Sequence, residues 1–280
     1  MSWPTAFTTL PVRRRPERSI PLRVVNPVRG ASLCYVLRED AELADVISRP
    51  HREEAIAHCT AREVRIPAGD DVSESFPLTS GLGMLVLNGL LIGRVGIDGR
   101  FGAEILGEGD LLRPWQWETD SATLPLEMAW SIVEPVRLAL LDDDFVDRMI
   151  GRFPELAAAV VGRAMQRARN LAVNMAIVHQ ARVDSRLHML LWHLAGRWGR
   201  VRTEGTVVPF RLTHRTLADL VAARRPTVTS ALSDLSRRGL VQSRGGEWIL
   251  FGGPPRELLD IDGVGVPIAR DTLPPLASSS

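Results

Sequence analysis

The stretch from Leu212 to Gly252 reads LTHRTLADLVAARRPTVTSALSDLSRRGLVQSRGGEWILFG and holds two short helical patterns followed by two strand patterns. Thr213 stands before the first helix, where its hydroxyl can accept a hydrogen bond from a free backbone N–H. Ala222-Ala223 is small enough for two helices to meet at a sharp turn. Arg225-Pro226 then begins a second helix, because proline loses no hydrogen bond at the first helical position.

The second helix has an apolar side and a polar side. Its apolar residues repeat at helical spacing and are expected to be buried: Val228, Ala231, Leu232 and Leu235. Its polar residues gather near the N-terminus, where a recognition helix needs donors for base edges and phosphates: Arg224, Arg225, Thr227, Thr229 and Ser230. Leu240-Val241 and Trp248 to Leu250 are typical of two strands around the Gly245-Gly246 turn. The stretch therefore predicts a winged helix-turn-helix.

Charge is unevenly distributed along the chain. From Arg211 to Gly252, seven arginines stand against three acidic residues, a net charge of +4, whereas the whole chain carries +1. Positive charge is thus concentrated where DNA phosphates would lie. An ordinary helical hairpin with a solvated polar face is the alternative, since a helix-turn-helix pattern alone is easily mimicked. The strand pair and the basic asymmetry favour binding to double-stranded DNA.

The segment RTLADLVAARRPTVTSALSDLSRRGLV resembles the DNA-binding domain of the Crp–Fnr family of transcription regulators. The resemblance implies an α+β fold: an N-terminal antiparallel β-roll (jelly-roll-like) sensor domain, a long dimerisation helix and a C-terminal winged helix-turn-helix. Members that read G·C pairs as the cyclic AMP receptor protein does carry Glu and a further Arg where this chain has Pro226 and Ser230. The recognised DNA sequence should therefore differ.

The position of each residue in the family motif implies its role at the DNA. Arg225, Thr227 and Ser230 are expected at base edges, with Thr229 on the same polar face. The residues expected at phosphates are Thr213, His214, Arg224 and Arg237 or Arg238.

The same resemblance divides the chain into five parts. These are a flexible extension (1–30), a cyclic-nucleotide-binding-like β-roll (31–152), a dimerisation helix (153–180), the winged helix-turn-helix (181–252) and a tail (253–280).

Short apolar runs separated by glycine turns predict the strands of the β-roll. Gly83 to Ile97 reads as two strands around an Asn88-Gly89 hairpin, and residues 121–133 and 136–141 as two further strands. Asp142-Asp143-Asp144 is expected to cap the next helix rather than to form a carboxylate active site. Residues 199–209 are expected to be a loop.

The ligand cassette of the family is degenerate in this chain. In members that bind cyclic nucleotides, a short helix begins with Gly-Glu, and an Arg a few residues later pairs with the cyclic phosphate. Residues 113–120, RPWQWETD, contain neither that opening nor an Arg-Ser or Arg-Thr pair. Cyclic AMP is therefore not the expected ligand. Arg113, Trp115 and Trp117 either line an apolar effector pocket or pack the β-roll.

The helix that begins at Pro154 carries an unbroken seam of apolar and small residues spaced alternately four and three apart. The seam residues are Ala157, Val161, Ala164, Ala168, Leu171, Met175 and Val178. They form either the interface of a homodimer or the face of a helix packed on its own β-roll. The family resemblance favours the dimer, and a two-fold symmetric protein should bind a pseudo-palindromic operator.

Other classes of function find little support. The sequence has no apolar run near the roughly 20 residues that span a bilayer, so we expect a cytoplasmic protein without a membrane partner. Cys34, Cys59, His51 and His58 fit no compact metal pattern, so neither a metal nor a cofactor is expected. An enzyme on a cupin-like barrel needs clustered histidines, and residues 83–141 contain none.

The sequence thus predicts a dimeric transcription regulator and no enzyme. A small-molecule effector at the β-roll and RNA polymerase are further expected partners. The alternative is a constitutive DNA-binding protein whose β-roll serves only structure and dimerisation.

Overall fold

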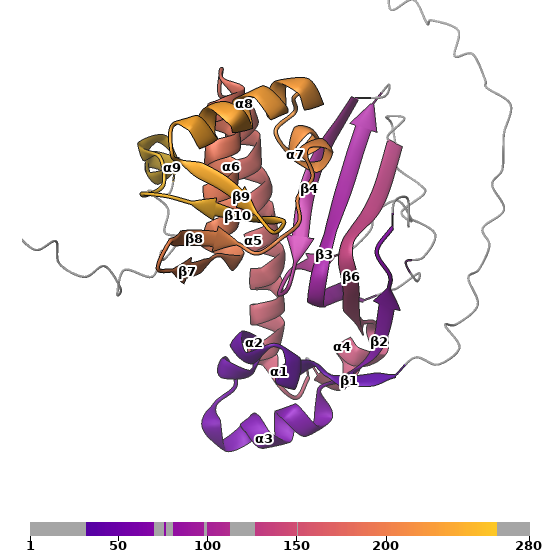
Figure 1. Cartoon of the computed structure of the whole chain (residues 1–280). Helices are drawn as coiled ribbons and strands as arrows, with labels where there is room; N and C mark the ends of the chain where they lie inside the picture. Colours follow the sequence, from indigo (N-terminus) through magenta and orange to yellow (C-terminus); the bar gives the residue numbers. More distant parts are fainter. Residues whose placement is uncertain are drawn as a thin grey trace, which may run out of the picture.

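The structure, a computed structural model, describes residues 32–69, 76, 81–97, 100–112, 127–149 and 151–261. An antiparallel sheet, a long helix and a C-terminal module of helices and short strands follow one another along the chain (Figure 1). The expected N-terminal extension and residues 113–120 lie outside the described residues. No helix in the described part of the chain is both long and apolar enough to cross a bilayer.

Among the described residues, the N-terminal sheet has six strands, all paired antiparallel, in the order β1-β2-β6-β3-β4, with β5 on β3. The strands are β1 (Leu33–Tyr35), β2 (Thr60–Ile66), β3 (Gly83–Ile97), β4 (Arg100–Gly107), β5 (Leu111–Leu112) and β6 (Glu127–Leu141). Together with the long helix and the C-terminal helix-turn-helix, this sheet confirms the expected fold class.

The Asn88-Gly89 hairpin prediction is wrong, because β3 continues through these residues as one strand. Both halves of β3 pair with β6 in the same direction, and the register shifts between Asn88 and Leu90. Gly89 has φ +93°, and a Cβ there would lie 2.2 Å from the carbonyl oxygen of Pro135. The Asn-Gly pair therefore forms a β-bulge beside a proline that cannot donate to the ladder.

The two strands expected at residues 121–133 and 136–141 are likewise one strand over their described part. β6 runs from Glu127 to Leu141 and passes through Pro135 without a break. Pro135 lies opposite the bulge in β3, where the regular pairing is already interrupted, so its missing N–H does not end the strand.

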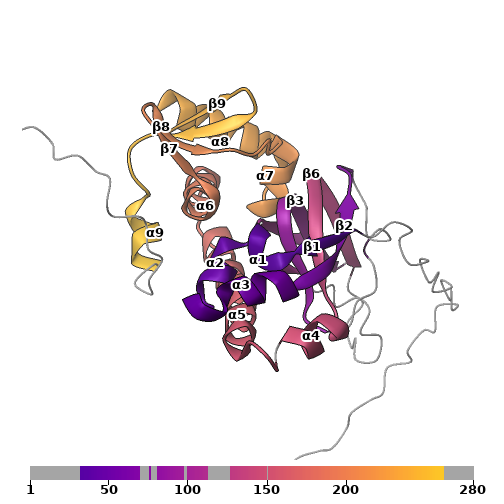
Figure 2. The same cartoon turned by 90° about the horizontal axis from the view of Figure 1, so that it is seen from below.

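Three short helices between β1 and β2 cover one end of the sheet (Figure 2): α1 (Val36–Glu39), α2 (Ala41–Asp45) and α3 (Arg49–His58). With α4 (Asp143–Met149) they enclose an apolar cluster that includes Cys34 and Cys59. Burial raises the pKa of the Cys34 thiol to about 11 and that of Cys59 to about 12. Both thiols are therefore protonated, and they pack as small apolar groups.

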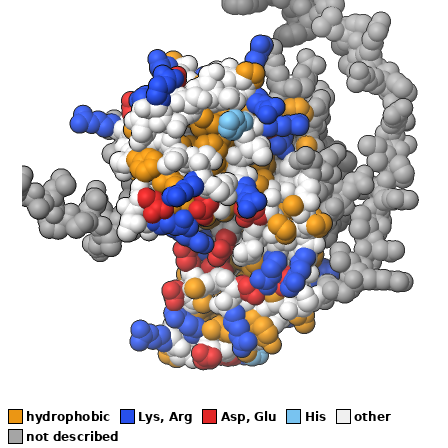
Figure 3. Space-filling view, in the orientation of Figure 1, with side chains coloured by type: hydrophobic (Ala, Val, Ile, Leu, Met, Phe, Trp, Pro, Cys, Tyr) orange, Lys and Arg blue, Asp and Glu red, His pale blue; other side chains and the backbone are white. Residues whose placement is uncertain are grey.

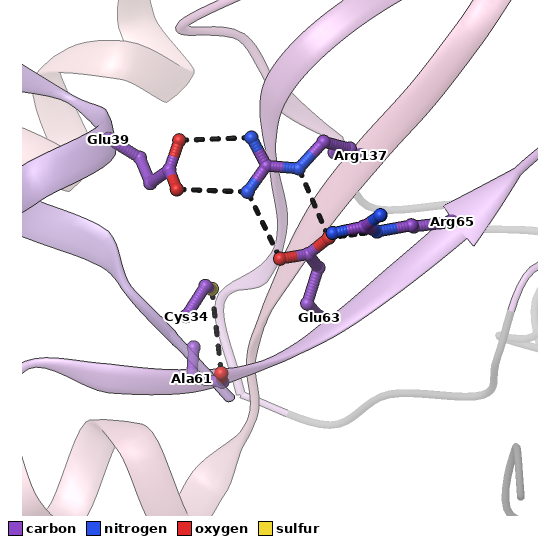
Figure 4. A network of polar contacts seen from close by, with 6 residues as sticks. All are labelled: Cys34, Glu39, Ala61, Glu63, Arg65 and Arg137. Atoms are coloured by element: carbon purple, nitrogen blue, oxygen red, sulfur yellow. Dashed lines mark hydrogen bonds and ion pairs between the residues drawn. The ribbon is translucent and has the colours of Figure 1, made fainter. Parts of the chain in front are cut away.

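A cluster of charged groups fastens these helices to the sheet (Figure 4). The Arg137 guanidinium on β6 donates two hydrogen bonds to Glu39, at 3.0 and 2.9 Å, and two to Glu63, both at 3.1 Å. Glu63, which also accepts from Arg65, is 5% exposed. The hydrogen bonds from Arg137 lower the pKa of both carboxyl groups, so the cluster stays ionised and mutually neutralised.

The long helix α5 (Pro154–Val178) begins at Pro154, as predicted. It buries Leu156, Val160, Val173 and Ile177 against the rest of the chain. The seam lies on another side of the helix, and three of its four large residues are exposed: Val161 is 53%, Leu171 38% and Met175 63% exposed, whereas Val178 is half-buried. The described chain therefore does not cover the seam, which weighs against the interpretation that it packs on its own sheet.

The C-terminal module starts with α6 (Val183–Trp198) and combines helices with a small sheet. Its further elements are β7 (Arg200–Arg202), β8 (Gly205–Val208), α7 (His214–Leu220), α8 (Arg225–Arg237), β9 (Val241–Arg244), β10 (Glu247–Leu250) and α9 (Arg256–Ile261). The loop predicted at residues 199–209 instead contains the β7–β8 hairpin, and β8 pairs with β10 in a four-stranded sheet. The hairpin escaped prediction because its strands have only three and four residues.

The module is docked on the N-terminal sheet through a shared apolar core. Leu90, Ile92 and Ile105 of the sheet belong to the same buried cluster as Leu217 and Leu220 of α7. An ion pair joins the same elements: Arg94 of β3 donates to Asp219 of α7 at 2.9 Å and also to Ser131 of β6.

Candidate nucleic-acid interface

The local sequence sets the angle between α7 and α8. Thr213 caps α7, since its hydroxyl oxygen accepts a hydrogen bond from the backbone N–H of Thr216 at 3.1 Å. Ala222 in the turn has φ +49°, a left-handed conformation that is costly for a residue with a Cβ. Arg186 of α6 braces this turn by donating to the carbonyl oxygens of Val221 and Ala222. The cap at Thr213 and the tight alanine turn were both predicted.

α8 divides into a buried and an exposed side as its sequence indicates. Val228, Ala231, Leu232 and Leu235 are buried against α6, α7 and β9. The exposed residues of its N-terminal half include all five candidates that the sequence places there: Arg224, Arg225, Thr227, Thr229 and Ser230. α8 crosses the molecule at the far end from α1–α3 (Figure 1).

The structure brings candidate residues of two helices together. The Nδ1 atom of His214, at the start of α7, lies 3.0 Å from the hydroxyl oxygen of Thr229 on α8. Thr213 stands next to His214, so the N-termini of α7 and α8 contribute to one surface. The start of α7 and the exposed start of α8 therefore form a continuous polar strip.

Arg237 and Arg238 lie at the opposite end of α8 and are engaged differently. Arg237 pairs with Asp234, and Arg238 lies 3.3 Å from Asp184, which also accepts two bonds from Arg182. A phosphate would have to compete with these carboxylates. The assignment of Arg237 or Arg238 to a phosphate contact remains a prediction.

The wing, which is the hairpin of β9 and β10, lies beside the start of α7. Gly245 (φ +62°) and Gly246 (φ +93°) make the turn between β9 and β10, as the Gly-Gly pair predicted. A Cβ on Gly246 would come within 2.9 Å of Arg211 Cγ, so the arginine packs directly on this turn. A groove runs between the wing and α7; it is lined by Arg211, Leu212, Thr213, His214, Ser243, Gly245, Gly246 and Trp248.

Several residues of this surface were not among the predicted contacts. Arg211 and Ser243 line the groove, and Arg215 and Arg244 are exposed on α7 and β9. The local excess of arginine signalled a basic surface. The spacing along the chain, however, could not show that the wing turn meets residues that precede α7.

The arginines of residues 211–252 are of two kinds, those that form an ion pair with a carboxylate and those that do not. Asp219, Asp234 and Glu247, the three acids of residues 211–252, pair with Arg94, Arg237 and Arg202. Within the described part of the chain, no ion pair involves Arg211, Arg215, Arg224, Arg225 or Arg244. Arginine side chains are frequent on the upper part of the face in Figure 3, and acidic side chains gather lower down. The surface of the module thus carries uncompensated positive charge.

The histidines of α6 do not contribute to a site of this kind. His188 Nε2 accepts a hydrogen bond from Trp192 Nε1 at 3.0 Å. Burial lowers the pKa of His188, and it lowers that of His193 to about 4. Among the residues the structure describes, no group of three or more His, Cys, Asp or Glu side chains could hold a metal ion.

The candidate effector residues Arg113, Trp115 and Trp117 lie outside the described residues, so their pocket remains a prediction. The turn before them is described. Asp110 accepts a hydrogen bond from the backbone N–H of Gly107 at 2.8 Å and pairs with Arg197 of α6. Burial raises the pKa of the Asp110 carboxyl and lowers the pKa of the Arg197 guanidinium. The opposite charge of the partner acts against both shifts, because each group stabilises the charged form of the other.

A basic winged helix-turn-helix with an exposed second helix is the architecture of a sequence-reading DNA-binding protein. Comparison with known proteins shows what the chain resembles. Residues 185–251 match the model of the Crp-like helix-turn-helix domain. The CRP-like cAMP-activated global transcriptional regulator of Mycobacterium tuberculosis is 28% identical over 189 residues, which are 65% of this chain and 80% of that protein.

Solved structures show the same fold. A cyclic nucleotide-binding domain containing protein from Listeria monocytogenes has a TM-score of 0.55 at 13% identity, over 75% of this chain and 96% of its own. FixK2 from Bradyrhizobium japonicum has a TM-score of 0.53 at 15% identity, over 74% and 99% of the two chains. The helix-turn-helix match and the relative from Mycobacterium tuberculosis confirm the resemblance to Crp–Fnr regulators, and they support a DNA-binding transcription regulator.

Proposed function

We propose that this regulator binds a pseudo-palindromic operator as a homodimer, with α8 of each protomer in the major groove. The observation that carries the proposal is the exposed start of α8, where Arg224 and Arg225 have no carboxylate partner among the described residues. The residues that contact base edges are Arg225, Thr227 and Ser230. The residues that bind phosphates, and so position the protein on the DNA, are Thr213, His214 and Arg224. An operator reader of this kind acts in the cytoplasm, where RNA polymerase is a further partner.

The open seam on α5 supports the dimer. Exposed valine, leucine and methionine side chains at four-three spacing match the interface that two such helices form in a coiled coil. Two copies joined along α5 would place their recognition helices about 34 Å apart, one turn of the DNA.

A selection experiment tests operator binding and dimerisation together. The full chain is incubated with random duplexes at moderate salt, and the retained duplexes are sequenced. We expect two inverted half-sites for the wild type and a single half-site for Met175→Glu, which places a charge in the seam. Ala158→Glu adds the same charge to an exposed position of α5 off the seam and should keep both half-sites. Unrelated retained sequences, or a dimeric Met175→Glu protein, would overturn the proposal.

We further propose that a small molecule at the β-roll modulates operator affinity. The sheet and α7 share a core, and Arg94 links them directly, so a shift in the sheet biases the helix. The relative from Mycobacterium tuberculosis is described as cAMP-activated, but residues 113–120 here lack the phosphate motif. We therefore expect cyclic AMP to leave operator affinity unchanged and a small-molecule fraction of bacterial extract to alter it. No response to the extract would favour the effector-independent alternative.

A further inference from the structure

The outermost stripe of α8 has an unusual composition. At 100° per residue, Pro226, Ser230, Ser233 and Arg237 fall opposite the buried residues of the helix, and all four are exposed. This stripe would lie deepest in the major groove. Its centre consists of two short hydroxyl side chains, and Ser233 was not among the residues the sequence singled out.

Both serine hydroxyls already use their only proton. Ser230 donates to the carbonyl oxygen of Pro226 at 3.2 Å, and Ser233 donates to that of Thr229 at 3.0 Å. A hydroxyl has one donor and two acceptor lone pairs, so what it still offers outward is acceptor capacity. Donating to a base instead would cost the bond to the helix backbone.

The neighbours on the stripe add no free donor. Pro226 has no backbone N–H and presents an apolar ring. Arg237 is held by Asp234 one turn earlier. The centre of the stripe is therefore a surface of acceptors, flanked by the cation of Arg225.

We propose that Ser230 and Ser233 determine operator specificity by accepting hydrogen bonds from base amino groups in the major groove. This inference rests on the proposed operator binding and adds its base chemistry. Only adenine N6 and cytosine N4 are donors in that groove, whereas guanine O6, thymine O4 and purine N7 are acceptors. Each half-site therefore carries adenine or cytosine opposite these serines, beside a guanine that Arg225 reads.

Base analogues in the selected operator test the direction of these hydrogen bonds. Purine in place of adenine removes the N6 amino group, and 7-deazaadenine removes only the N7 acceptor. We expect purine to weaken binding about three- to tenfold, the range of one neutral hydrogen bond, and 7-deazaadenine to have little effect. At a cytosine, pyrimidin-2-one removes the amino group in the same way.

Protein variants connect each effect to its side chain. Ser230→Ala and Ser233→Ala should each abolish the amino-group effect at one base position, because the acceptor has gone. Ser236→Ala is the matched control, an exposed serine of α8 that lies off the stripe. It should leave the analogue effects unchanged.

The outcomes separate the two proposals. If 7-deazaadenine weakens binding and purine does not, the serines donate and the inference is wrong while operator binding stands. If the amino-group effect persists in both serine variants, other residues read these bases and the inference is again wrong. If the full chain enriches no sequence at all, operator binding fails and the inference falls with it.

Discussion

Where the sheet meets the helices, arginines face carboxylates, whereas several arginines on the outer surface of the winged helix have no carboxylate partner among the described residues. Arg137 holds Glu39 and Glu63, and Arg197 holds Asp110. On the module, Arg224 and Arg225 are exposed without such a partner among the described residues. The same side chain therefore stabilises the fold in one region and remains available to an external anion in the other.

The difference follows from the cost of burying charge. A guanidinium withdrawn from water must be neutralised by a carboxylate nearby, or the fold loses stability. An exposed guanidinium carries no such requirement, and its charge raises the local concentration of phosphate. We therefore propose that the presence of a partner carboxylate, rather than the number of arginines, distinguishes structural positions from DNA-binding positions.

The largest expected effect is on the free energy of unfolding. It shows whether the interface between the sheet and the helices tolerates an additional positive charge that has no carboxylate partner. His193 faces a cavity lined by Glu104, Arg167, Asn174 and Arg197, and burial lowers its pKa to about 4. In the unfolded chain the His193 imidazole takes up a proton near pH 6.5, whereas in the folded chain it does so only near pH 4. The contribution of neutral His193 to the free energy of unfolding is therefore fully present above pH 6.5 and is lost as the pH drops toward 4. The full loss is about 3 kcal/mol. Urea unfolding at pH 7 and pH 5 should show this decline, and His193→Gln should reduce it; an equal decline in the variant would contradict it.

Removing a structural arginine should affect folding alone. Arg137→Ala leaves the buried Glu63 carboxylate with Arg65 as its remaining ion-pair partner, which should lower the free energy of unfolding by about 2–3 kcal/mol. Denaturant unfolding measures the loss, and DNA affinity of the folded fraction serves as the control. An unchanged stability, or a specific loss of DNA binding, would break the distinction between the two regions.

A smaller effect is expected at the turn between α7 and α8. Ala222 adopts φ +49°, so Ala222→Gly should relieve strain, offset in part by the greater freedom of glycine in the unfolded chain. We expect a net stabilisation of about 0.5 kcal/mol, seen as a higher midpoint of thermal unfolding. Ala223→Gly, in the same turn but without a positive φ, should destabilise. The reverse order would mean that the turn is not strained.

Much of the C-terminal module follows from local sequence. The Thr213 cap, the alanine turn, the apolar face of α8 and the Gly-Gly wing turn each depend on residues a few positions apart. The hairpin prediction at Asn88-Gly89 was wrong because hairpin turns and β-bulges favour the same residue types. Only the pairing of β3 with its neighbouring strand decides between the two structures. Spacing along the chain likewise could not show which arginines meet a carboxylate, since Arg94 and Asp219 lie 125 residues apart.

The most direct measurement compares wild type and Arg225→Ala on the selected operator and on a scrambled duplex, each over a range of salt concentrations. If Arg225 reads a base, the variant should lose about 1–3 kcal/mol of binding free energy on the operator and little on the scrambled duplex. Equal losses on both duplexes would make Arg225 a phosphate contact. No loss on either would contradict the proposal that the α8 arginines without a carboxylate partner bind DNA.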